Sequence, residues 1–348
     1  WLIDYVKPKK EYYLGTMDSW LIYKLTKGTS FKTDATNASR TQLYDIHTGT
    51  WSEELCKLFG IDQKNLAEIH DCNAVFGYTD FEGILSKEIP ITAVMGDSHA
   101  ALYGHGCHKA GQVKTTLGTG SSIMMNIGTK EKLSTNGLST SVAYSVDGIR
   151  TFTIEGNINY AGAVISWLKN DLELIEDANE TQKIILESNP NDKTVLVPAF
   201  TGLGAPYWNM HAKAMFYGMT RTTTWKELVK ASVESIAYQI TDILNAMEND
   251  TGISMKEVKA DGGPSKNQYL MQFLAECAQN TVCVCLQEEL SATGVAYMAG
   301  LTVGIYQKDN LFHQLKYNVY QNHFNCSEWQ SQMNRWYEAI KLIQGKGV

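Results

Sequence analysis

The stretch "KEVKADGGPSKNQYLMQFLAECAQNTVCVCL", residues 256–286, decides the fold class of this chain. Its first residues alternate polar and apolar side chains and end in a glycine pair, which predicts a strand that enters a tight turn. Residues 268–278 follow helical spacing, and residues 281–286 are an apolar run that predicts a second strand. Alternating strand and helix segments of this kind favour an α/β fold.

The glycine turn at residues 260–267, "ADGGPSKN", has a chemical interpretation as well as a structural one. Backbone amides between a strand and a helix, together with the positive end of the helix dipole, favour a phosphate or a closely approaching ribose. The segment is not a Walker loop, because no Gly-Lys-Ser/Thr follows, and it lacks the spacing of a dinucleotide fingerprint. Taken alone, it fits a plain structural turn better.

A second glycine turn lies in "TTLGTGSS", residues 115–122, within a longer segment that predicts two strands. Glycines on both sides of Thr119 let the backbone direct amides into one concavity, and the hydroxyls of Thr119, Ser121 and Ser122 add donors. Such a nest suits a phosphate. A β-hairpin whose turn simply requires glycine explains the same residues, and this segment alone favours the hairpin.

A third turn follows residues 88–97, which predict a strand closed by Gly96 and followed by a helix. Asp97 stands at the start of that helix, where an N-cap is the commonest role of aspartate. A carboxylate there is also placed to accept the proton of an attacking hydroxyl. The residue type does not separate these roles. Ligands of open α/β sheets gather at the carboxyl ends of strands, so three such turns together favour a binding cleft.

The longest predicted helix covers residues 225–247, where apolar residues recur every three or four positions. Thr224 and Glu227 fit a capping box at its start. The other predicted elements are helices at residues 291–306 and 327–343 and strands at residues 151–157 and 194–200.

The composition limits the class of protein. With 348 residues, 44% of them hydrophobic and 19% charged, the chain can bury a sizeable core, and its length suggests about two domains. The net charge of −7 argues against nucleic acid as a partner. No apolar run approaches the roughly 18 residues of a membrane helix, so we expect no membrane segment. Seven cysteines, an odd number in a chain of this size, indicate reduced thiols and a cytoplasmic protein.

Several longer motifs occur together in one order. They are "GTMDSWLIYKLT", "TDATNASRTQLYDIHT", "GDSHAALYG", "GTGSSIMMNIG", "NGLSTSVAY", "FTGLGAPYW", "DGGPSKNQYLMQF" and "TGVAYMAGL". In this set the chain resembles the FGGY carbohydrate kinases, and within them the glycerol kinases. The likeness runs from end to end, and residues 214–234 are similar to the family's C-terminal signature.

The resemblance implies an α/β, actin-like (ribonuclease H-like) ATPase fold with two domains and an interdomain cleft. Residues 1–104 match the latter part of the family's first domain, which carries the catalytic aspartate. Residues 105–348 match the whole C-terminal, nucleotide-binding domain. Family members are often dimers or tetramers, so the resemblance also implies a homodimer or a homotetramer.

The resemblance carries specific roles onto this sequence. Asp97 matches the catalytic base that takes the proton of an attacking primary hydroxyl on a polyol or sugar. Family members use ATP with Mg²⁺, and Asp97 would help to hold the metal through water, with no direct protein ligand to the metal assigned. The positions that match nucleotide contacts are Thr119, Gly162, Ser166, Gly263 and Asn267.

Three positions depart from the glycerol kinase pattern. Ser98 stands where glycerol kinases carry glutamine, and Ser122 stands where they carry an aromatic residue, and both positions face the substrate in that family. Two hydroxyls in place of an amide and a ring predict a larger and more polar pocket, and hence a substrate such as a four- or five-carbon polyol or ketose. Ser166 replaces a glutamine beside the nucleotide.

A larger departure is an absence. The family begins with a phosphate hairpin of the Gly-x-Asp-x-Gly-Thr type and with substrate-binding arginine, glutamate and tryptophan residues, and these do not occur in this sequence. We therefore expect an N-terminally truncated chain that does not turn over by itself. Two alternatives remain open at this point, namely an actin-like chaperone or filament ATPase and a non-catalytic module that binds nucleotide or sugar.

Overall fold

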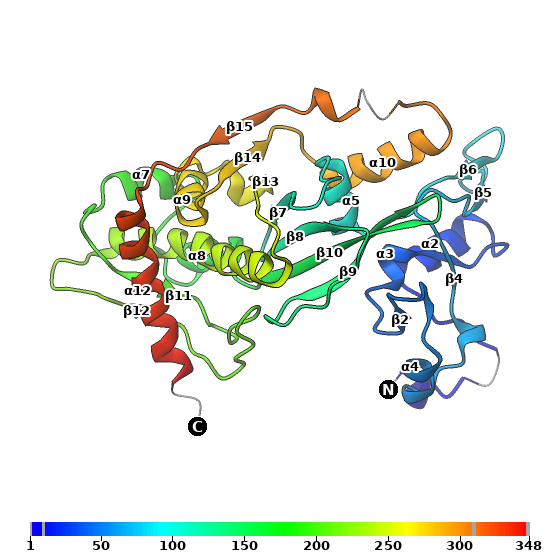
Figure 1. The fold of residues 1–348 in the computed structure, drawn as a ribbon, viewed down its shortest axis with the longest axis horizontal. Helices are drawn as coiled ribbons and strands as arrows, with labels where there is room; N and C mark the ends of the chain where they lie inside the picture. Colours follow the sequence, from blue (N-terminus) through cyan, green and yellow to red (C-terminus); the bar gives the residue numbers. More distant parts are fainter. Residues whose placement is uncertain (1, 9–10, 308–310, 346–348) are drawn as a thin grey trace.

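The computed structural model describes residues 2–8, 11–307 and 311–345, which form two lobes (Figure 1). We call residues 2–104 the first lobe and residues 105–345 the second lobe. Figure 1 shows the first lobe up to β6 (Ile89–Ile91) in blue and cyan at one end of the molecule, its last helix α5 (Asp97–Gly104) beside the sheet of the second lobe, and helix α12 (Cys326–Gln344) near the opposite end.

The first lobe is built from short elements. Its strands pair only two at a time, as β1 with β4, β2 with β3 and β5 with β6. In chain order its elements are α1 (Leu2–Val6), α2 (Met17–Leu25), β1 (Lys32–Asp34), α3 (Ala35–Ala38), β2 (Tyr44–Asp45), β3 (Thr50–Trp51), α4 (Glu53–Leu58), η1 (Gln63–Asn65), β4 (Glu68–His70), β5 (Gly77–Thr79), β6 (Ile89–Ile91) and α5 (Asp97–Gly104).

The second lobe is organised around a seven-stranded sheet with the order β15-β14-β13-β7-β8-β10-β9. Strand β13 runs parallel to β7 and β14, and the other neighbours are antiparallel. The sheet strands are β7 (Val113–Leu117), β8 (Ser121–Gly128), β9 (Ser139–Val146), β10 (Ile149–Ile158), β13 (Glu257–Gly262), β14 (Thr281–Cys285) and β15 (Tyr317–Tyr320). The other elements are α6 (Gly162–Asn170), α7 (Glu180–Leu186), β11 (Val195–Val197), β12 (Met215–Tyr217), α8 (Trp225–Thr251), η2 (Gly263–Lys266), α9 (Gln268–Ala278), α10 (Leu290–Thr302) and η3 (Phe312–Gln314).

The predicted α/β class is confirmed, and residues 256–286 form β13, η2, α9 and β14. Helix α9 covers residues 268–278 as predicted, because Asn267 caps its first turn by accepting a hydrogen bond from the Leu270 amide. The capping box of Thr224 and Glu227 at the start of α8 is also present. Local side-chain chemistry therefore sets where these helices begin.

The strand predicted for residues 88–97 is wrong over most of its length. Only Ile89–Ile91 form a strand, β6, which pairs with β5. Residues 92–96 continue as irregular backbone toward α5, and single contacts fix them, such as the hydrogen bond from the Val94 amide to the Cys72 carbonyl. An apolar, β-branched run resembles a strand in any sequence, but it becomes one only where a partner strand lies alongside.

The two faces of the central sheet differ in chemistry. One face carries side chains such as Val113, Leu117 and Val258, which pack in the main core against α8 residues Ile236 and Ile240. The opposite face is directed toward α5, where Leu102 packs against Met124. Because strand side chains alternate between faces, the residues between these apolar positions, including Lys114 and Thr116 on β7, lie on the α5 side.

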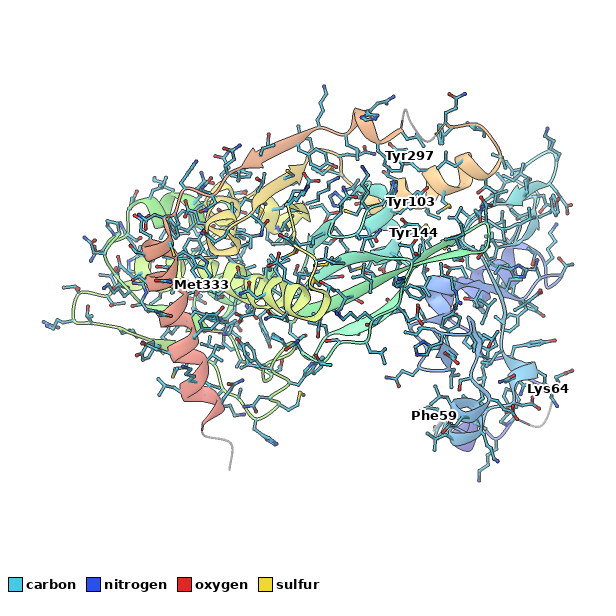
Figure 2. The ribbon with its side chains drawn as sticks, viewed as in Figure 1. Phe59, Lys64, Tyr103, Tyr144, Tyr297 and Met333 are labelled. Carbon is cyan, nitrogen blue, oxygen red and sulfur yellow. The ribbon has the colours of Figure 1, made fainter. Side chains whose placement is uncertain are left out.

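Helices α5 and α10 join the lobes by a close backbone crossing. A Cβ on Gly294 would lie 1.8 Å from the Ala100 carbonyl oxygen, and one on Gly104 would lie 2.5 Å from the Leu290 carbonyl oxygen. Only glycine permits this approach. Aromatic rings surround the crossing, and Figure 2 shows Tyr103, Tyr144 and Tyr297 close together there. The ring centroids of Tyr103 and Tyr144 are 5.3 Å apart in an edge-to-face arrangement.

The described part of the chain contains no helix with both the length and the apolar character needed to cross a bilayer.

Candidate active site

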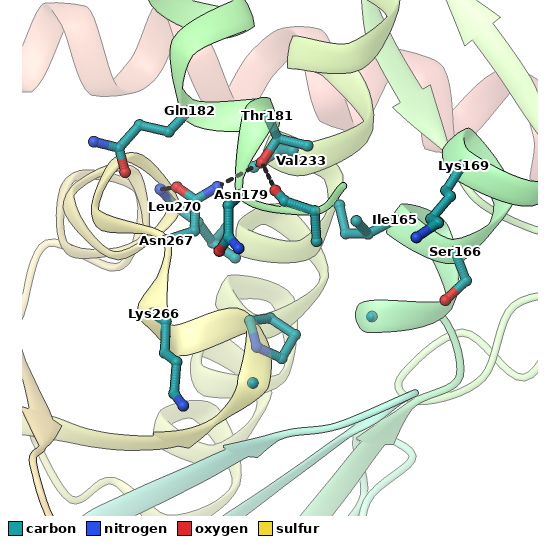
Figure 3. A pocket seen from close by; sticks show the side chains of 14 residues that line it. Ile165, Ser166, Lys169, Asn179, Thr181, Gln182, Val233, Lys266, Asn267 and Leu270 are labelled. Carbon is teal, nitrogen blue, oxygen red and sulfur yellow. Dashed lines mark hydrogen bonds between the residues drawn. The ribbon is translucent and has the colours of Figure 1, made fainter. Parts of the chain in front are cut away.

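A cavity of about 360 Å³ opens in the second lobe between α6, α7 and the turn η2 (Figure 3). This volume falls in the range of roughly 300–1,000 Å³ typical of small-molecule sites. We call it the η2 cavity. It is lined by Gly162, Ile165, Ser166, Lys169, Ala178, Asn179, Thr181, Gln182, Val233, Gly263, Pro264, Lys266, Asn267 and Leu270. Four of the five residues assigned to the nucleotide by resemblance, Gly162, Ser166, Gly263 and Asn267, are among them.

The η2 wall of the cavity depends on Gly262. Its φ is +93°, and a Cβ there would lie 2.0 Å from the Leu117 carbonyl oxygen. Glycine lets β13 end against β7 and turn directly into η2. The next residue, Gly263, has nothing within 4 Å of the position that a Cβ would take, so its backbone is open to the cavity.

Asn267 connects η2 to α7 across the cavity. Its amide nitrogen Nδ2 donates to Thr181 Oγ1 at 3.0 Å, while its Oδ1 accepts from the Leu270 amide at 3.0 Å. Figure 3 shows this link, with Ser166 and Lys169 on the opposite side of the cavity. The lining includes the two cations Lys169 and Lys266 and no carboxylate, but the Lys266 ammonium pairs with Glu288 at 3.0 Å just outside the lining. The positive charge of Lys169 in particular favours an anionic ligand.

The start of α6 is fastened to the glycine turn 118–120. The Gly162 amide donates to the Gly118 carbonyl at 2.9 Å, and the Ala161 and Ala163 amides donate to the Thr119 carbonyl. A Cβ on Gly162 would lie 2.6 Å from the Gly118 oxygen, so this contact also requires glycine. Thr119, the fifth residue assigned to the nucleotide, is therefore held at the edge of the η2 cavity, and its side chain is exposed.

The three hydroxyls predicted to converge in an anion nest do not do so. Ser121 is buried, and its Oγ lies 2.9 Å from Thr115 Oγ1 on the core side of the sheet. Ser122 is on the other face and is half-buried, with its hydroxyl bonded to two neighbouring side chains. Period-two alternation along β8 separates these neighbours, so only Thr119 presents a hydroxyl at the turn. The hairpin itself is present, since β7 and β8 pair antiparallel on either side of the turn.

Asp97 is the first residue of α5, and the N-cap is Gly96. The simple N-cap role for Asp97 is therefore wrong. Its side chain is exposed, and Oδ1 accepts from the Ser98 amide at 2.6 Å, while Ser98 itself is half-buried. The Gly96 amide donates to Thr36 Oγ1 at 2.8 Å, so the capped start of α3 fixes the backbone that carries Asp97. A carboxylate in this first turn is stabilised by the helix dipole and remains open to solvent.

Lys114 is a charged residue that no motif in the sequence singled out. It is fully buried on β7, and its ammonium donates to Thr116 Oγ1 at 3.3 Å and Ser122 Oγ at 3.1 Å. Burial lowers the pKa of Lys114, while the negative charges of Asp261, Glu155 and Asp97 act in the opposite direction. No signal in the sequence indicates this burial, since lysine is rarely fully buried unless its charge is compensated.

The exposed carboxylate of Asp97 fits one requirement of Mg²⁺, which usually binds through one or two carboxylates together with substrate phosphates and water. The described residues contain no group of three His, Cys, Asp or Glu side chains arranged to hold a metal. A magnesium ion carried in with phosphates needs no such cage, and within the described part of the chain no group donates a hydrogen bond to Oδ2 of Asp97.

Comparisons with known proteins match most of the chain. The N-terminal domain of the FGGY family of carbohydrate kinases matches residues 5–104, and the C-terminal domain of the same family matches residues 113–303. Glycerol kinase 1 of Thermotoga maritima is 46% identical over 312 residues, and glycerol kinase of Deinococcus radiodurans is 39% identical over 348 residues.

Solved structures give the same result. The crystal structure of Plasmodium falciparum glycerol kinase with ADP superposes with a TM-score of 0.88 and 34% identity, covering 95% of this chain and 67% of that one. The ligand-bound xylulose kinase of Lactobacillus acidophilus superposes with a TM-score of 0.84 at 19% identity, which shows the shared fold alone.

The matches differ in how much of each relative they cover. The alignment with Thermotoga maritima glycerol kinase 1 includes 88% of this chain but 63% of that protein, and the alignment with the Deinococcus radiodurans enzyme includes 98% and 69%. The two family domains meet near the α5–α10 crossing, as their matched ranges end and begin at residues 104 and 113. With both family domains and these relatives matched, the chain belongs to the FGGY family of carbohydrate kinases.

Proposed function

We propose that this chain carries the nucleotide site and the catalytic base of an ATP-dependent kinase that phosphorylates a primary hydroxyl of glycerol or a related polyol or sugar. The supporting observation is the η2 cavity, which collects Gly162, Ser166, Gly263 and Asn267 from segments far apart in the sequence. The neighbouring turn with Thr119 gives the phosphates a place to bind. The crystal structure of Plasmodium falciparum glycerol kinase with ADP, which has a similar fold, supports the proposal of a nucleotide site in this chain.

The adenosine part of ATP would occupy the η2 cavity, and its phosphates would extend past the start of α6 toward Thr119. Lys169 and Lys266 would attract the anion. Mg²⁺, held by the phosphates and through water by Asp97, would neutralise the charge on the transferring group.

In the transfer step Asp97 accepts the proton of the substrate hydroxyl as its oxygen attacks the γ-phosphorus. A new oxygen–phosphorus bond forms, and the bond between the γ-phosphorus and the bridging oxygen breaks, with ADP as leaving group. The exposed position of Asp97 at the first turn of α5 supports this role, because the carboxylate is free of a buried ion pair.

The substrate proposed is larger than glycerol, because Ser98 and Ser122 replace a glutamine and an aromatic ring of glycerol kinases. The Ser122 hydroxyl donates to Glu155 Oε1 at 3.1 Å and accepts from Lys114, so the surroundings of Ser122 are polar beyond the serine itself. A higher kcat/KM for glycerol than for every four- and five-carbon polyol or ketose would overturn this choice of substrate.

We also propose that the two domains divide between residues 104 and 105, that the protein is cytoplasmic, and that it assembles as a homodimer or a homotetramer. Size-exclusion chromatography with light scattering decides the last point.

Binding is tested by titration calorimetry with ATP. Asn267→Asp keeps the oxygen that caps α9, loses the donor to Thr181 and places a negative charge in the cavity. It should weaken ATP binding by about tenfold with the fold intact. Asn191→Ala, an exposed asparagine outside the cavity, is the control. No heat of binding from ATP to the unmodified chain would contradict the proposal.

The transfer step is tested by polyol-dependent ADP formation, measured for this chain alone and for this chain co-expressed with the part of Thermotoga maritima glycerol kinase 1 that it does not span. Asp97→Asn should leave ATP binding unchanged and reduce transfer by about 10²-fold or more. ATP hydrolysis that does not respond to any polyol would instead indicate an ATPase of another role.

A further inference from the structure

Helix α3 of the first lobe is docked directly onto the sheet of the second lobe. Just after its last turn, Ser39 Oγ accepts a hydrogen bond from the Val142 amide of β9 at 3.2 Å. The next residue, Arg40, places a guanidinium nitrogen 2.8 Å from Glu155 Oε2 on β10. The Arg40 side chain is 42% exposed and the Glu155 side chain 5% exposed, so the ion pair lies at the boundary between solvent and interior.

The ion pair continues inward as a chain of hydrogen bonds. Glu155 Oε1 accepts from Ser122 Oγ at 3.1 Å, and Ser122 Oγ accepts from the Lys114 ammonium at 3.1 Å. Lys114 also donates to Thr116 Oγ1 at 3.3 Å. Each link joins a different strand, so the chain crosses from β10 through β8 to β7.

The chain ends beside the glycine turn 118–120. Thr116 and Ser122 are directly opposite each other in the β7–β8 register, and only the pair Leu117 and Ser121 separates them from the turn. The buried ammonium of Lys114 bonds both hydroxyls and therefore ties the two strands together at that position. None of the ion pairs at 4.0 Å or less among the described residues involves Lys114, so its charge depends on the surrounding carboxylates at longer range.

A network of this kind responds as a unit. Buried charged groups lose much of their stabilisation when one partner is removed, because the remaining partner is left unpaired in a poorly solvated site. Loss of Arg40 removes the cation that pairs directly with Glu155, and loss of the Ser122 hydroxyl separates Glu155 from Lys114. Either change should loosen the strand ends at the turn.

We propose that Arg40, Glu155, Ser122 and Lys114 form a positioning network. Through this network, the contact of α3 with the sheet of the second lobe keeps the glycine turn 118–120 ordered. The same helix α3 holds Gly96 through Thr36, so one element fixes both the backbone before Asp97 and this network. Lys114 is a positioning residue, because its buried ammonium acts through the hydroxyls of Thr116 and Ser122. The proposal depends on the proposed function in one respect only, namely that the glycine turn 118–120 binds the phosphates of ATP.

The test is amide hydrogen exchange, measured by mass spectrometry on peptides that cover residues 117–122 of the nucleotide-free chain. Arg40→Gln and Ser122→Ala should each raise exchange in this peptide by about threefold or more, although Arg40 is in the other lobe. Lys114→Met is a third variant. Arg150→Gln is the matched control, since Arg150 also joins β10 to the first lobe, through the carbonyls of Ile46 and His47, at the opposite end of the strand.

Unchanged exchange at residues 117–122 in either Arg40→Gln or Ser122→Ala would overturn the proposal, as would an equal rise in Arg150→Gln. A rise in both variants and not in the control supports it, and unchanged exchange in a folded Lys114→Met variant would contradict the place of Lys114 in the network. The function is read separately by adding ATP to the unmodified chain. No protection of the turn by ATP would count against the proposed function, while the comparison among nucleotide-free variants still decides the network.

Discussion

Gly262 and Gly263 are adjacent residues with opposite structural roles. Gly262→Ala should destabilise the protein and weaken ATP binding by about tenfold or more, because its φ is +93° and its Cβ would meet the Leu117 carbonyl oxygen. Gly263→Ala should leave the free energy of unfolding nearly unchanged and weaken only ATP binding, because its Cβ would project into open space. Urea unfolding and calorimetry separate the two effects. Equal stability of both variants would contradict this division.

Asp242 is a second residue with a distinct expected behaviour. It is buried on α8, and Oδ2 accepts hydrogen bonds from Tyr207 at 2.8 Å and from Trp336 at 2.7 Å. Burial raises the pKa of Asp242 to about 7, against the lowering effect of those hydrogen bonds. The folded state therefore holds a proton that the unfolded state releases near pH 4, and stability from this group falls as the pH rises from about 4 to about 7.

The difference in unfolding free energy between the unmodified chain and Asp242→Asn should consequently decrease by about 3 kcal/mol between pH 5 and pH 8. Asp250 supplies the control. Burial raises its pKa, but hydrogen bonds from Ser134, Thr135 and Asn136 outweigh this effect and lower it below the usual value. For Asp250→Asn the same difference should stay constant over this pH range. A constant difference for Asp242→Asn would show that its carboxyl titrates normally.

At the scale of elements, the capping box of α8 makes a measurable contribution. Thr224→Ala should lower the free energy of unfolding by about 1 kcal/mol, because the Lys226 amide loses its side-chain acceptor. Thr224→Ser retains a hydroxyl and should lower the free energy of unfolding by much less. Glu227 links the same helix start to the Asn189 amide at 2.7 Å, so a loss well above this value would indicate that the loop before β11 is disturbed as well.

The crossing of α5 and α10 gives a second prediction for elements. Gly294→Ala should destabilise the protein by about 2 kcal/mol or more, because the new methyl group would overlap the Ala100 carbonyl. Ala296→Ser, on the exposed side of α10, should have almost no effect on the unfolding midpoint. Similar unfolding midpoints for both variants would mean that α5 and α10 can move apart without loss of stability.

The sequence allowed some elements to be placed accurately and not others, and the difference follows from the range of the interactions. The starts of α8 and α9 were predictable because Thr224 and Asn267 act within one helical turn. Helix α8 continues to Thr251, four residues beyond the predicted end, and stops at Gly252 in the left-handed conformation. The strand predicted at residues 88–97 failed because strand pairing depends on segments far away in the chain.

The candidate site divides in the same way. The η2 cavity could be predicted because its glycines and Asn267 belong to motifs that are visible in the sequence. Lys114 and Arg40 could not, since a lysine in a strand and an arginine after a short helix ordinarily face solvent. Their partners become apparent only when β7, β8 and β10 are aligned and α3 is docked on them.

At the scale of the whole molecule, the two lobes differ in the size of their sheets and hydrophobic cores. The first lobe has strands paired only two at a time and a small cluster around Ile22, Phe76 and Val94. The second lobe has the seven-stranded sheet and the main core. Two-stranded sheets are marginally stable alone, so we expect the first lobe to unfold before the second.

Differential scanning calorimetry should therefore show two transitions, with the lower one assigned to the part of the first lobe that precedes α5, because α5 packs against the sheet and α10 of the second lobe. ATP should raise the upper transition more than the lower one, because the η2 cavity belongs to the second lobe. Brief proteolysis below the upper transition should leave the second lobe intact. A single transition whose calorimetric and van't Hoff enthalpies agree would contradict this order.

The complete burial of Lys114 has one consequence for the surroundings in which the protein works. Dissolved counter-ions gather around exposed lysines such as Lys169 and Lys266 and weaken their field beyond about 8 Å at physiological ionic strength. They cannot enclose an ammonium that has no contact with water. The bonds of Lys114 to Thr116 and Ser122, and with them the joined ends of β7 and β8, should therefore be nearly as strong in concentrated brine as in dilute buffer.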